Sequence, residues 1–190
     1  MNKNYIEGKT FDKIDFSVNA LPVANYECCT FRNCNFSEAD LSNSIFSACD
    51  FSMCNLSMAK LFQTGFREVK FKECKLAGLH FETCNHFLFS ASFETCLLSF
   101  SSFYKLNLKK TIFKNSTLHE VDFAEVDLTE SAFLNCDLMN TIFDNTLLEK
   151  VDFRTSFNYS INPTFNRIKK AKFSLKGILG LLQQYDIEIE

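Results

Sequence analysis

The fold is decided by residues 31–61, FRNCNFSEADLSNSIFSACDFSMCNLSMAKL, where a large apolar residue occupies every fifth position. These residues are Phe31, Phe36, Leu41, Phe46, Phe51, Leu56 and Leu61. An α-helix repeats its buried face about every 3.6 residues and a strand repeats it every second residue, so neither explains this spacing. A chain that turns a corner every five residues does explain it, because one residue on each side then points inward.

Four sides of this length close a square coil of about 20 residues, so residues 20 apart in the sequence should stack in one column. The first column, which we expect to form the structural core, is entirely phenylalanine: Phe11, Phe31, Phe51, Phe71, Phe93, Phe113, Phe133, Phe153 and Phe173. The other three columns are also large and apolar, and the fourth passes from Phe66 to Leu88. Phe66 and Leu88 are 22 residues apart instead of 20, which indicates a two-residue insertion near residues 85–87.

The columns predict an all-β fold, a right-handed quadrilateral β-helix of about eight coils in which each coil pairs with the next at ~4.8 Å. Residues 1–173 form this β-helix, and residues 154–173 are a degenerate last coil because Asn158 and Pro163 take two inward positions. Residues 174–190 follow as a C-terminal element. The chain has 5 Gly and 2 Pro. These are few for an all-β protein, so we expect other residues to form the corners.

Composition limits the cellular setting and the partners. The formal net charge of −3 argues against a nucleic-acid binder that relies on a basic field. No stretch of about 18 uncharged apolar residues could span a membrane, and the N-terminus has no apolar leader. We therefore expect a cytoplasmic protein whose nine cysteines are reduced thiols.

The cysteines follow the same grid as the core. Eight of the nine stand two positions before an inward residue, a place that requires a small side chain, and only Cys28 does not. The eight are Cys29, Cys34, Cys49, Cys54, Cys74, Cys84, Cys96 and Cys136. A free cysteine behaves as a small hydrophobe, whereas zinc sites pair cysteines about two to four residues apart. We expect a structural role for these cysteines, with no metal and no other cofactor.

The residue before the inward position is often Asp or Asn, as in Asp40, Asp122 and Asp152. Segments such as Ala39-Asp40-Leu41-Ser42-Asn43 and Val121-Asp122-Phe123-Ala124-Glu125 thus resemble the A(D/N)LXX unit of the pentapeptide-repeat family. The resemblance covers about residues 6–173. It implies the β-helix already predicted from the period, and it is weak for function because the family is functionally diverse.

The sequence of residues 174–190 predicts a short helix that begins after Ser174 and covers the last coil. A short strand is predicted to follow from Tyr185. This layout resembles the C-terminal end of the fluoroquinolone-resistance pentapeptide-repeat proteins, which meet there as two-fold dimers. The resemblance implies a homodimer through the apolar residues Leu175, Ile178, Leu179, Leu182, Ile187 and Ile189.

Sequence motifs for catalysis are absent: there is no Gly-rich phosphate loop, no HExxH and no nucleophile elbow. His86 lies close to Cys84 beside the insertion, so a Cys–His dyad is one interpretation and a surface loop histidine is the other. A rod filled with side chains offers no interior pocket. We therefore expect a non-enzymatic protein without a small-molecule substrate.

Charge is segregated along the chain, because nine acids and a single Lys lie between Leu118 and Asp152. The acids form a candidate partner-binding patch: Glu120, Asp122, Glu125, Asp127, Glu130, Asp137, Asp144, Glu149 and Asp152. Basic residues flank this stretch on both sides. Outward charges can serve solubility alone, or they can provide electrostatic complementarity to a partner.

The residues favour a protein-interaction scaffold whose partner is another protein. The family resemblance implies an alternative, a DNA mimic that binds DNA gyrase or topoisomerase IV and protects it from fluoroquinolones. A second alternative is a nucleic-acid or membrane-surface binder that uses basic faces over Lys60–Lys75 and Lys105–Lys114. The net charge of −3 does not favour either a nucleic-acid or a membrane partner.

Overall fold

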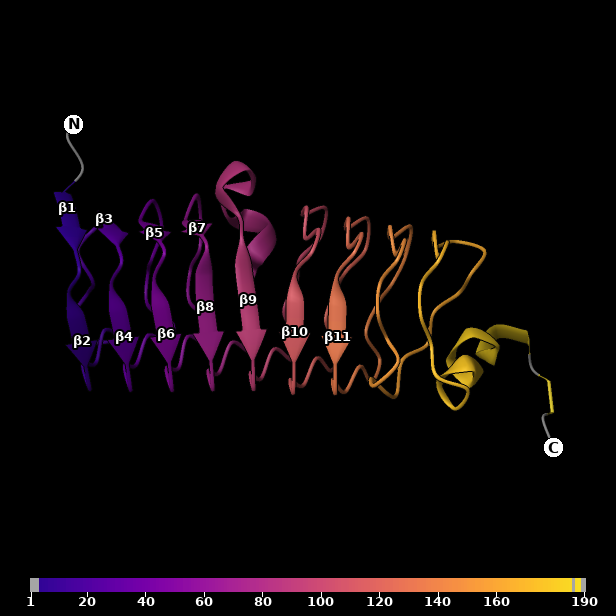
Figure 1. Ribbon diagram of the computed structural model, residues 1–190. Helices are drawn as coiled ribbons and strands as arrows, with labels where there is room; N and C mark the ends of the chain where they lie inside the picture. Colours follow the sequence, from indigo (N-terminus) through magenta and orange to yellow (C-terminus); the bar gives the residue numbers. More distant parts are fainter. Residues whose placement is uncertain (1–3, 186, 189–190) are drawn as a thin grey trace.

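The chain forms a straight rod with its two ends at opposite tips (Figure 1). The computed structural model describes residues 4–185 and 187–188. It is a parallel β-solenoid of about seven turns, which confirms the all-β β-helix predicted from the five-residue period. Along the longer sheet, pairing continues beyond the last strand as single bridges, Ala132 to Asp152 and Asp152 to Lys172, so this sheet has seven strands rather than one for each of the eight coils predicted.

Two sides of the coil carry regular parallel sheets, which we call face 4 and face 1 after the columns they contain. Face 4 is built from β1 (Asn4–Glu7), β3 (Ala24–Glu27), β5 (Ile45–Ser47) and β7 (Gly65–Arg67). Face 1 is built from β2 (Thr10–Asp12), β4 (Thr30–Arg32), β6 (Asp50–Ser52), β8 (Val69–Lys72), β9 (Ala91–Glu94), β10 (Ile112–Lys114) and β11 (Ala132–Leu134). Each strand pairs with the strand one coil later, and the register places Phe31 beside Phe51 and Phe46 beside Phe66.

The other two sides pair through single bridges, and we call them face 2 and face 3. The face 2 bridges join Asn35 to Asn55 and Thr117 to Asp137, among others. The face 3 bridges join Asp40 to Lys60 and Ser102 to Asp122. Four pairing columns therefore surround one core, as the column analysis predicts.

The corners explain why the chain needs so little glycine and proline. Most residues two positions after an inward residue have left-handed backbone, with φ between 49° and 64° at 25 non-glycine positions. Cys28, the one cysteine outside the small positions, lies at such a corner with φ 51° and is exposed. Because each corner residue points outward at a sharp bend, its side chain is free of the core and its identity is weakly constrained.

The core is a continuous stack of aromatic rings. The nine phenylalanines of face 1 stack from Phe11 to Phe173 with ring centroids 4.6–5.5 Å apart. A second stack on face 3 runs from Phe81 through Phe103 and Phe123 to Phe143. The two stacks meet edge to face, as at Phe113 and Phe123, which is a favoured geometry for aromatic pairs. This core confirms the predicted structural column.

The small position two before each inward residue also carries hydrogen bonds between coils. The thiols of Cys54, Cys74 and Cys96 each donate to a backbone carbonyl 23 or 25 residues earlier at 3.4 Å. Thr141 and Ser156 occupy equivalent positions and donate the same bond at 2.7 Å. Where this position holds Cys, Ser or Thr, the small side chain fills the corner and its donor satisfies a carbonyl of the coil before.

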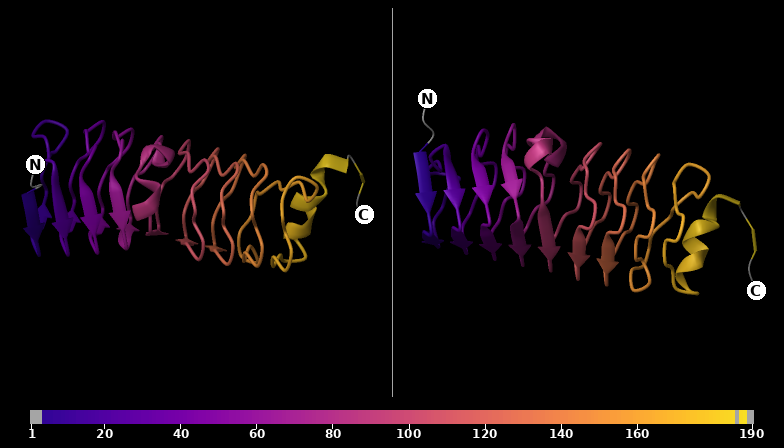
Figure 2. Two further views of the ribbon diagram at one scale, coloured as in Figure 1. Left: turned by 90° about the horizontal axis from the view of Figure 1, so that it is seen from above. Right: turned by 45° about the horizontal axis from the view of Figure 1, so that its top comes forward.

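The two-residue insertion produces a projecting loop with two short 3₁₀-helices, η1 (Phe81–Thr83) and η2 (His86–Leu88), visible in all views (Figures 1 and 2). The column prediction placed Leu88 in the core here, which is wrong. Phe89 packs edge to face against Phe66 and Phe81 instead. Leu88 lies over Gly65, where a β-carbon would be 3.0 Å from its Cδ1, so the missing side chain of glycine makes room for it.

The C-terminal element differs from the predicted α-helix and strand. It consists of two short 3₁₀-helices, η3 (Gly177–Leu181) and η4 (Gln183–Tyr185). The Ser174 hydroxyl accepts a hydrogen bond from the Gly177 N–H at 3.0 Å, as expected of a capping residue. Ile187 and Glu188 are not in a strand, and Ile189 lies outside the described residues. Within the described residues, no helix is long and apolar enough to cross a membrane.

Tyr159 and Leu181 close the last coil. Asn158 has left-handed backbone with φ 60° and points outward, so Tyr159 takes the inward place and packs against Phe153 and Phe173. Leu181 is buried, whereas Leu175, Ile178 and Leu179 on the predicted capping face are exposed. The element therefore packs on the last coil through a different side from the one predicted, because a 3₁₀-helix repeats about every three residues.

Candidate partner-binding surfaces

The nine acids of the predicted patch lie on all four faces of the rod. Asp122 and Asp144 are on face 3, Asp137 is on face 2, and Asp152 is on face 1, as their bridging columns show. Asp127 and Glu149 belong to face 4. A coil turns through one whole circuit every 20 residues, so acids that are close in the sequence point in different directions. The structure therefore does not bring the nine together as one patch.

Five of the nine acids contact basic side chains; four form ion pairs with Lys or Arg, and Asp137 lies against a histidine. These contacts are Lys105–Glu125 at 3.4 Å, Lys109–Asp127 at 3.1 Å, Lys110–Glu130 at 3.9 Å, His119–Asp137 at 2.8 Å and Arg154–Asp152 at 2.7 Å. Glu130 also pairs with Lys150. The basic stretch over Lys105–Lys114 is thereby neutralised as well, since Lys114 pairs with Glu94. Charge that looks segregated in the sequence alternates in space.

The pKa values of the paired acids follow these contacts. Hydrogen bonding to Lys150 lowers the pKa of Glu130, and hydrogen bonding to Arg154 lowers the pKa of Asp152. Burial raises the pKa of Asp137, but contacts with His119 and Asn158 outweigh it and bring the pKa below its ordinary value. Their partners therefore stabilise the charged form of these acids, and the contacts of Glu130 and Asp137 help to hold the coils together.

Four acids form no ion pair with any residue that the structure describes. Glu120, Asp122 and Asp144 lie on face 3 or at its leading corner, and Glu149 lies on face 4. Asp122 accepts a hydrogen bond from the Ala124 N–H and is otherwise directed outward. The part of the predicted patch that remains available to a partner is therefore concentrated around face 3.

Exposed apolar side chains gather on the same side of the rod, at the projecting loop. We call this set, Met58, Phe62, Phe87 and Phe100, the loop patch. Phe87 at the loop tip is 95% exposed, and Phe62 and Phe100 are 62% exposed. Met58 lies across Gly78, where a β-carbon would overlap its sulfur, and Phe100 follows one coil later at the same corner.

Two grooves flank Phe62. One, of about 520 Å³, lies between Phe62 and the loop residues Glu82–Phe87. The other, of about 310 Å³, is lined by Met58, Phe62 and Gly78. These four residues are not among those predicted from the sequence to bind a partner. A signal was present, because Phe62 and Phe100 are large apolar residues in outward positions of the five-residue grid, where polar residues are usual.

The Cys84–His86 dyad interpretation finds no support in the geometry. Cys84 is buried, and burial raises the pKa of its thiol, which disfavours the nucleophilic thiolate. His86 is exposed, and its Nε2 lies 2.7 Å from the carbonyl oxygen of Glu82. His80 Nδ1 lies 2.8 Å from a carboxylate oxygen of the same Glu82. The two histidines therefore brace the loop at its base.

All nine cysteines are free thiols, and the eight on the grid are buried. Burial raises the pKa of Cys96 and Cys136 to about 11. Among the described residues, no group of three or more His, Cys, Asp or Glu side chains is placed to hold a metal ion. The buried thiols fill space and donate the hydrogen bonds described above.

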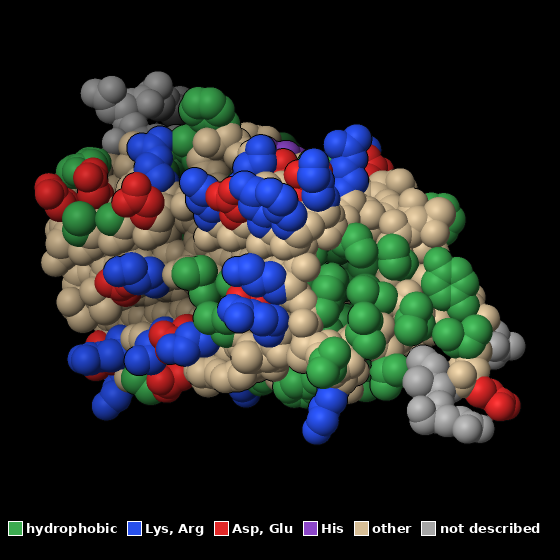
Figure 3. Space-filling view, turned by 45° about the vertical axis from the view of Figure 1, so that its right-hand side comes forward, with side chains coloured by type: hydrophobic (Ala, Val, Ile, Leu, Met, Phe, Trp, Pro, Cys, Tyr) green, Lys and Arg blue, Asp and Glu red, His purple; other side chains and the backbone are tan. Residues whose placement is uncertain are grey.

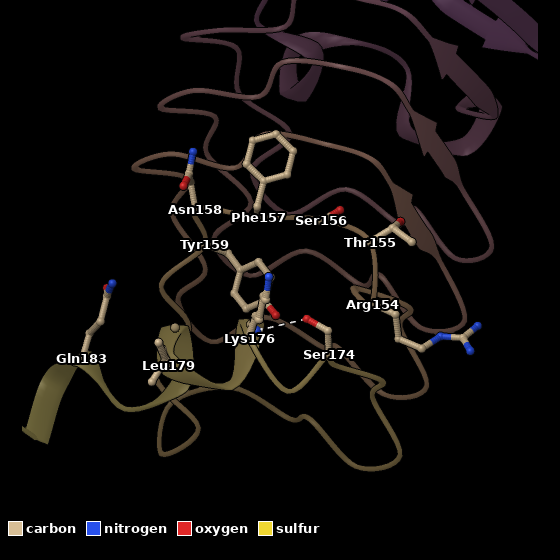
Figure 4. Close-up of a pocket in the computed structure, with 12 residues that line it drawn as sticks. Arg154, Thr155, Ser156, Phe157, Asn158, Tyr159, Ser174, Lys176, Leu179 and Gln183 are labelled. Carbon is tan, nitrogen blue, oxygen red and sulfur yellow. Dashed lines mark hydrogen bonds between the residues drawn. The ribbon is translucent and has the colours of Figure 1, made fainter. Parts of the chain in front are cut away.

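The predicted dimer residues lie at the C-terminal tip. Leu175, Ile178, Leu179 and Ile187 are exposed, and Leu182 is half-buried. A cavity of about 430 Å³ separates this element from the last coil, with Arg154, Tyr159, Ser174 and Lys176 among its lining residues (Figure 4). The rod therefore carries a cavity at this tip in addition to the two grooves beside Phe62.

Comparison with known proteins bears on the fold. The pentapeptide repeats family matches the chain in eight copies, over residues 27–63 and 116–154. No curated protein sequence matches significantly. Full-length QnrB1, a plasmid-mediated fluoroquinolone resistance protein, is 19% identical over 97% of this chain and 98% of that chain, with a TM-score of 0.48. HetL, a pentapeptide repeat protein involved in heterocyst differentiation regulation from the cyanobacterium Nostoc sp. strain PCC 7120, is 16% identical over 92% of this chain and 88% of that chain, with a TM-score of 0.38.

The matched repeats lie in both halves of the solenoid, and the same five-residue grid connects and extends them from β1 to the last coil. Sequence motif and structure thus agree on one repeating unit. The chain therefore carries pentapeptide repeats in both halves of the solenoid.

Proposed function

We propose that this protein is a non-catalytic scaffold that binds a partner protein through face 3, with the loop patch as the main contact. The observation that carries the proposal is the exposure of Met58, Phe62 and Phe87 around two grooves. Aromatic side chains dominate the energetics of protein interfaces, and contiguous exposed apolar groups mark interaction sites. The free acids Glu120 and Asp122 extend the surface and suit a partner with basic residues beside an apolar anchor.

A reducing compartment such as the cytoplasm is consistent with nine free cysteines, since thiols persist there. The rigid rod also suits a scaffold, because a surface that barely moves loses little conformational freedom on binding.

The proposal is tested by affinity capture from cells of the source organism, followed by mass spectrometry. The wild-type chain is compared with Phe62→Ser/Phe87→Ser and with the control Ile112→Ser, which changes an exposed apolar residue on face 1. We expect a protein that the wild type and the control both retain and the double variant loses. Equal retention by all three chains would contradict the use of the loop patch.

A second candidate is DNA mimicry toward a type II topoisomerase. The observation that favours it is the cluster of unpaired acids, Glu120, Asp122 and Asp144, around one side of a rod. Because Lys and Arg side chains pair with four other acids of the predicted patch, this candidate depends on those three rather than on the whole stretch.

A gyrase supercoiling assay with and without a fluoroquinolone separates this candidate from the first. DNA mimicry predicts inhibition or drug protection by the wild type that is lost in Glu120→Lys/Asp122→Lys/Asp144→Lys. The control Glu130→Gln alters an acid already paired with lysines and should behave as the wild type. No effect of the wild type at high protein concentration removes the candidate.

The homodimer through the C-terminal tip remains a prediction. Exposed Leu175, Ile178 and Leu179 support it, but the positive charge around them favours another use of the tip.

A further inference from the structure

We propose that the C-terminal tip of the rod docks onto the surface of an anionic phospholipid bilayer. The first observation is the apolar character of the tip. Leu175 is 91% exposed, and Ile178, Leu179 and Tyr185 are about half exposed. Figure 3, with the C-terminal end brought forward, shows hydrophobic side chains gathered over this part of the rod and Lys and Arg side chains beside them.

The second observation is a concentration of positive charge in the same segment. Residues 154–185 contain six Lys and Arg and no Asp or Glu. All six cations are exposed: Arg154, Arg167, Lys169, Lys170, Lys172 and Lys176. Arg154 is paired with Asp152, but Lys176 forms no ion pair with any described residue. Basic residues beside exposed apolar ones suit a surface that offers both phosphate groups and acyl chains.

The third observation is the cavity beneath the tip. Its lining includes Arg154, Lys176 and several hydroxyl groups, but no Asp or Glu. Tyr159, which is only 3% exposed, also lines it, and the Tyr159 hydroxyl is buried without a hydrogen-bond partner (Figure 4). A buried hydroxyl without a partner is costly. A phosphate oxygen of a lipid headgroup at the mouth of this cavity would supply an acceptor for the exposed Lys176 ammonium.

Charge complementarity decides between a bilayer and the other occupants. A two-fold dimer would place the same six cations of two copies around one interface, where like charges repel. A nucleic acid would attract the cations but leave Leu175 and Leu179 in water. An anionic bilayer meets both requirements at once, since the leucines enter the interfacial region while the cations contact phosphates.

The test is co-sedimentation of the full chain with phosphatidylcholine vesicles and with vesicles that also contain phosphatidylglycerol. We expect binding to the anionic vesicles, little binding to phosphatidylcholine alone, and loss of binding at high salt, because salt screens the attraction. Lys169→Gln/Lys170→Gln should weaken binding by roughly fivefold for each lysine removed. Leu175→Ser/Leu179→Ser should weaken it at every salt concentration.

Two matched variants complete the design. Lys105→Gln/Lys109→Gln removes two lysines that already pair with acids on the coils, and it should bind vesicles as the wild type does. Asp186→Asn/Glu188→Gln/Glu190→Gln removes the acids that follow the basic segment in the sequence, and it should bind more tightly.

The proposal is overturned by equal or absent binding to the two kinds of vesicle. It is also overturned if light scattering shows a stable dimer that Leu175→Ser/Leu179→Ser dissociates, because the tip is then covered by a second copy. Binding to duplex DNA that needs Lys169 and Lys170 but tolerates loss of both leucines would likewise assign the tip to nucleic acid.

Discussion

Phe113 lies in the middle of the face 1 stack, with Phe93 on one side and Phe133 on the other at centroid distances of 5.0 and 4.8 Å. Its replacement by alanine leaves a cavity that neighbouring coils cannot fill, because each coil is held by pairing on both sides. We expect Phe113→Ala to lower the free energy of unfolding by about 3–5 kcal/mol. Urea denaturation measures the loss, and Phe62→Ala, at an exposed position, should change stability little.

The cysteine positions require a small donor rather than sulfur chemistry. Ser116 and Ser156 stand in the same column as Cys96 and hydrogen-bond to backbone groups there. We therefore expect Cys96→Ser to cost no more than about 1 kcal/mol, since the bond to the Phe71 carbonyl can be kept. Cys96→Val keeps the volume but removes the donor, so denaturation should show it to be the less stable of the two variants. The opposite order would contradict this role.

The contacts of Asp137 with His119 and Asn158 make the stability of the folded chain depend on pH in the acidic range. Its pKa is lower in the folded chain than its ordinary value, so the unfolded state binds more protons at acidic pH. The stabilisation is complete above the unfolded pKa of about 3.9 and is lost as the pH falls through the lower folded value. Asp137→Asn should reduce the free energy of unfolding at neutral pH, and its difference from the wild type should shrink as the pH falls below the unfolded pKa of about 3.9. Urea midpoints across this range give the comparison, and a constant gap would refute the assignment.

At the scale of elements, the sequence predicts the regular coils correctly, but it does not predict how the chain packs where the coils are interrupted. The five-residue period identified the face 1 column from Phe11 to Phe173 because one inward side chain per side is a strict geometric requirement. It failed at Leu88, since a two-residue insertion allows either Leu88 or Phe89 to face inward and only packing decides between them. The 20-residue register also places Lys105 beside Glu125, where they form an ion pair. Counting charges along the sequence does not reveal this contact.

The C-terminal element depends on two glycines for its place on the last coil. A β-carbon at Gly180 would overlap the Tyr159 carbonyl oxygen, and one at Gly177 would overlap the Tyr159 hydroxyl. Ile161 N–H donates to the Gly180 carbonyl at 2.9 Å, so this contact also closes the backbone pairing. The sequence could not show the contact because η3 is not an α-helix and its buried side differs from the one predicted.

We expect Gly180→Ala to displace η3 while the coils remain folded, at a cost of about 1–3 kcal/mol typical of overpacking. Hydrogen exchange should show lost protection at Ile161 and in η3 but unchanged protection in β10. Gly8→Ala is the control for a glycine without neighbouring atoms, although its positive φ carries a small backbone cost. Intact protection around Tyr159 in Gly180→Ala would contradict the proposed docking.

At the scale of the whole molecule, each coil contacts only its neighbours, so the rod behaves as a one-dimensional array. Outward positions are therefore nearly independent of folding, and functional surfaces can be placed anywhere along it. In this chain the loop patch lies near the middle and the basic apolar tip lies at the C-terminal end. Their separation implies that the two surfaces can be altered one at a time.

The central claim is that face 3 at the loop patch is the surface that binds a partner protein. Site-specific photo-crosslinking in living cells tests it most directly, with a benzophenone amino acid placed at Phe62, at Phe87 or, as the control, at Ile112. The account predicts one discrete crosslinked species at Phe62 and Phe87 and none at Ile112. Equal crosslinking at all three positions, or a species only at Ile112, would contradict it.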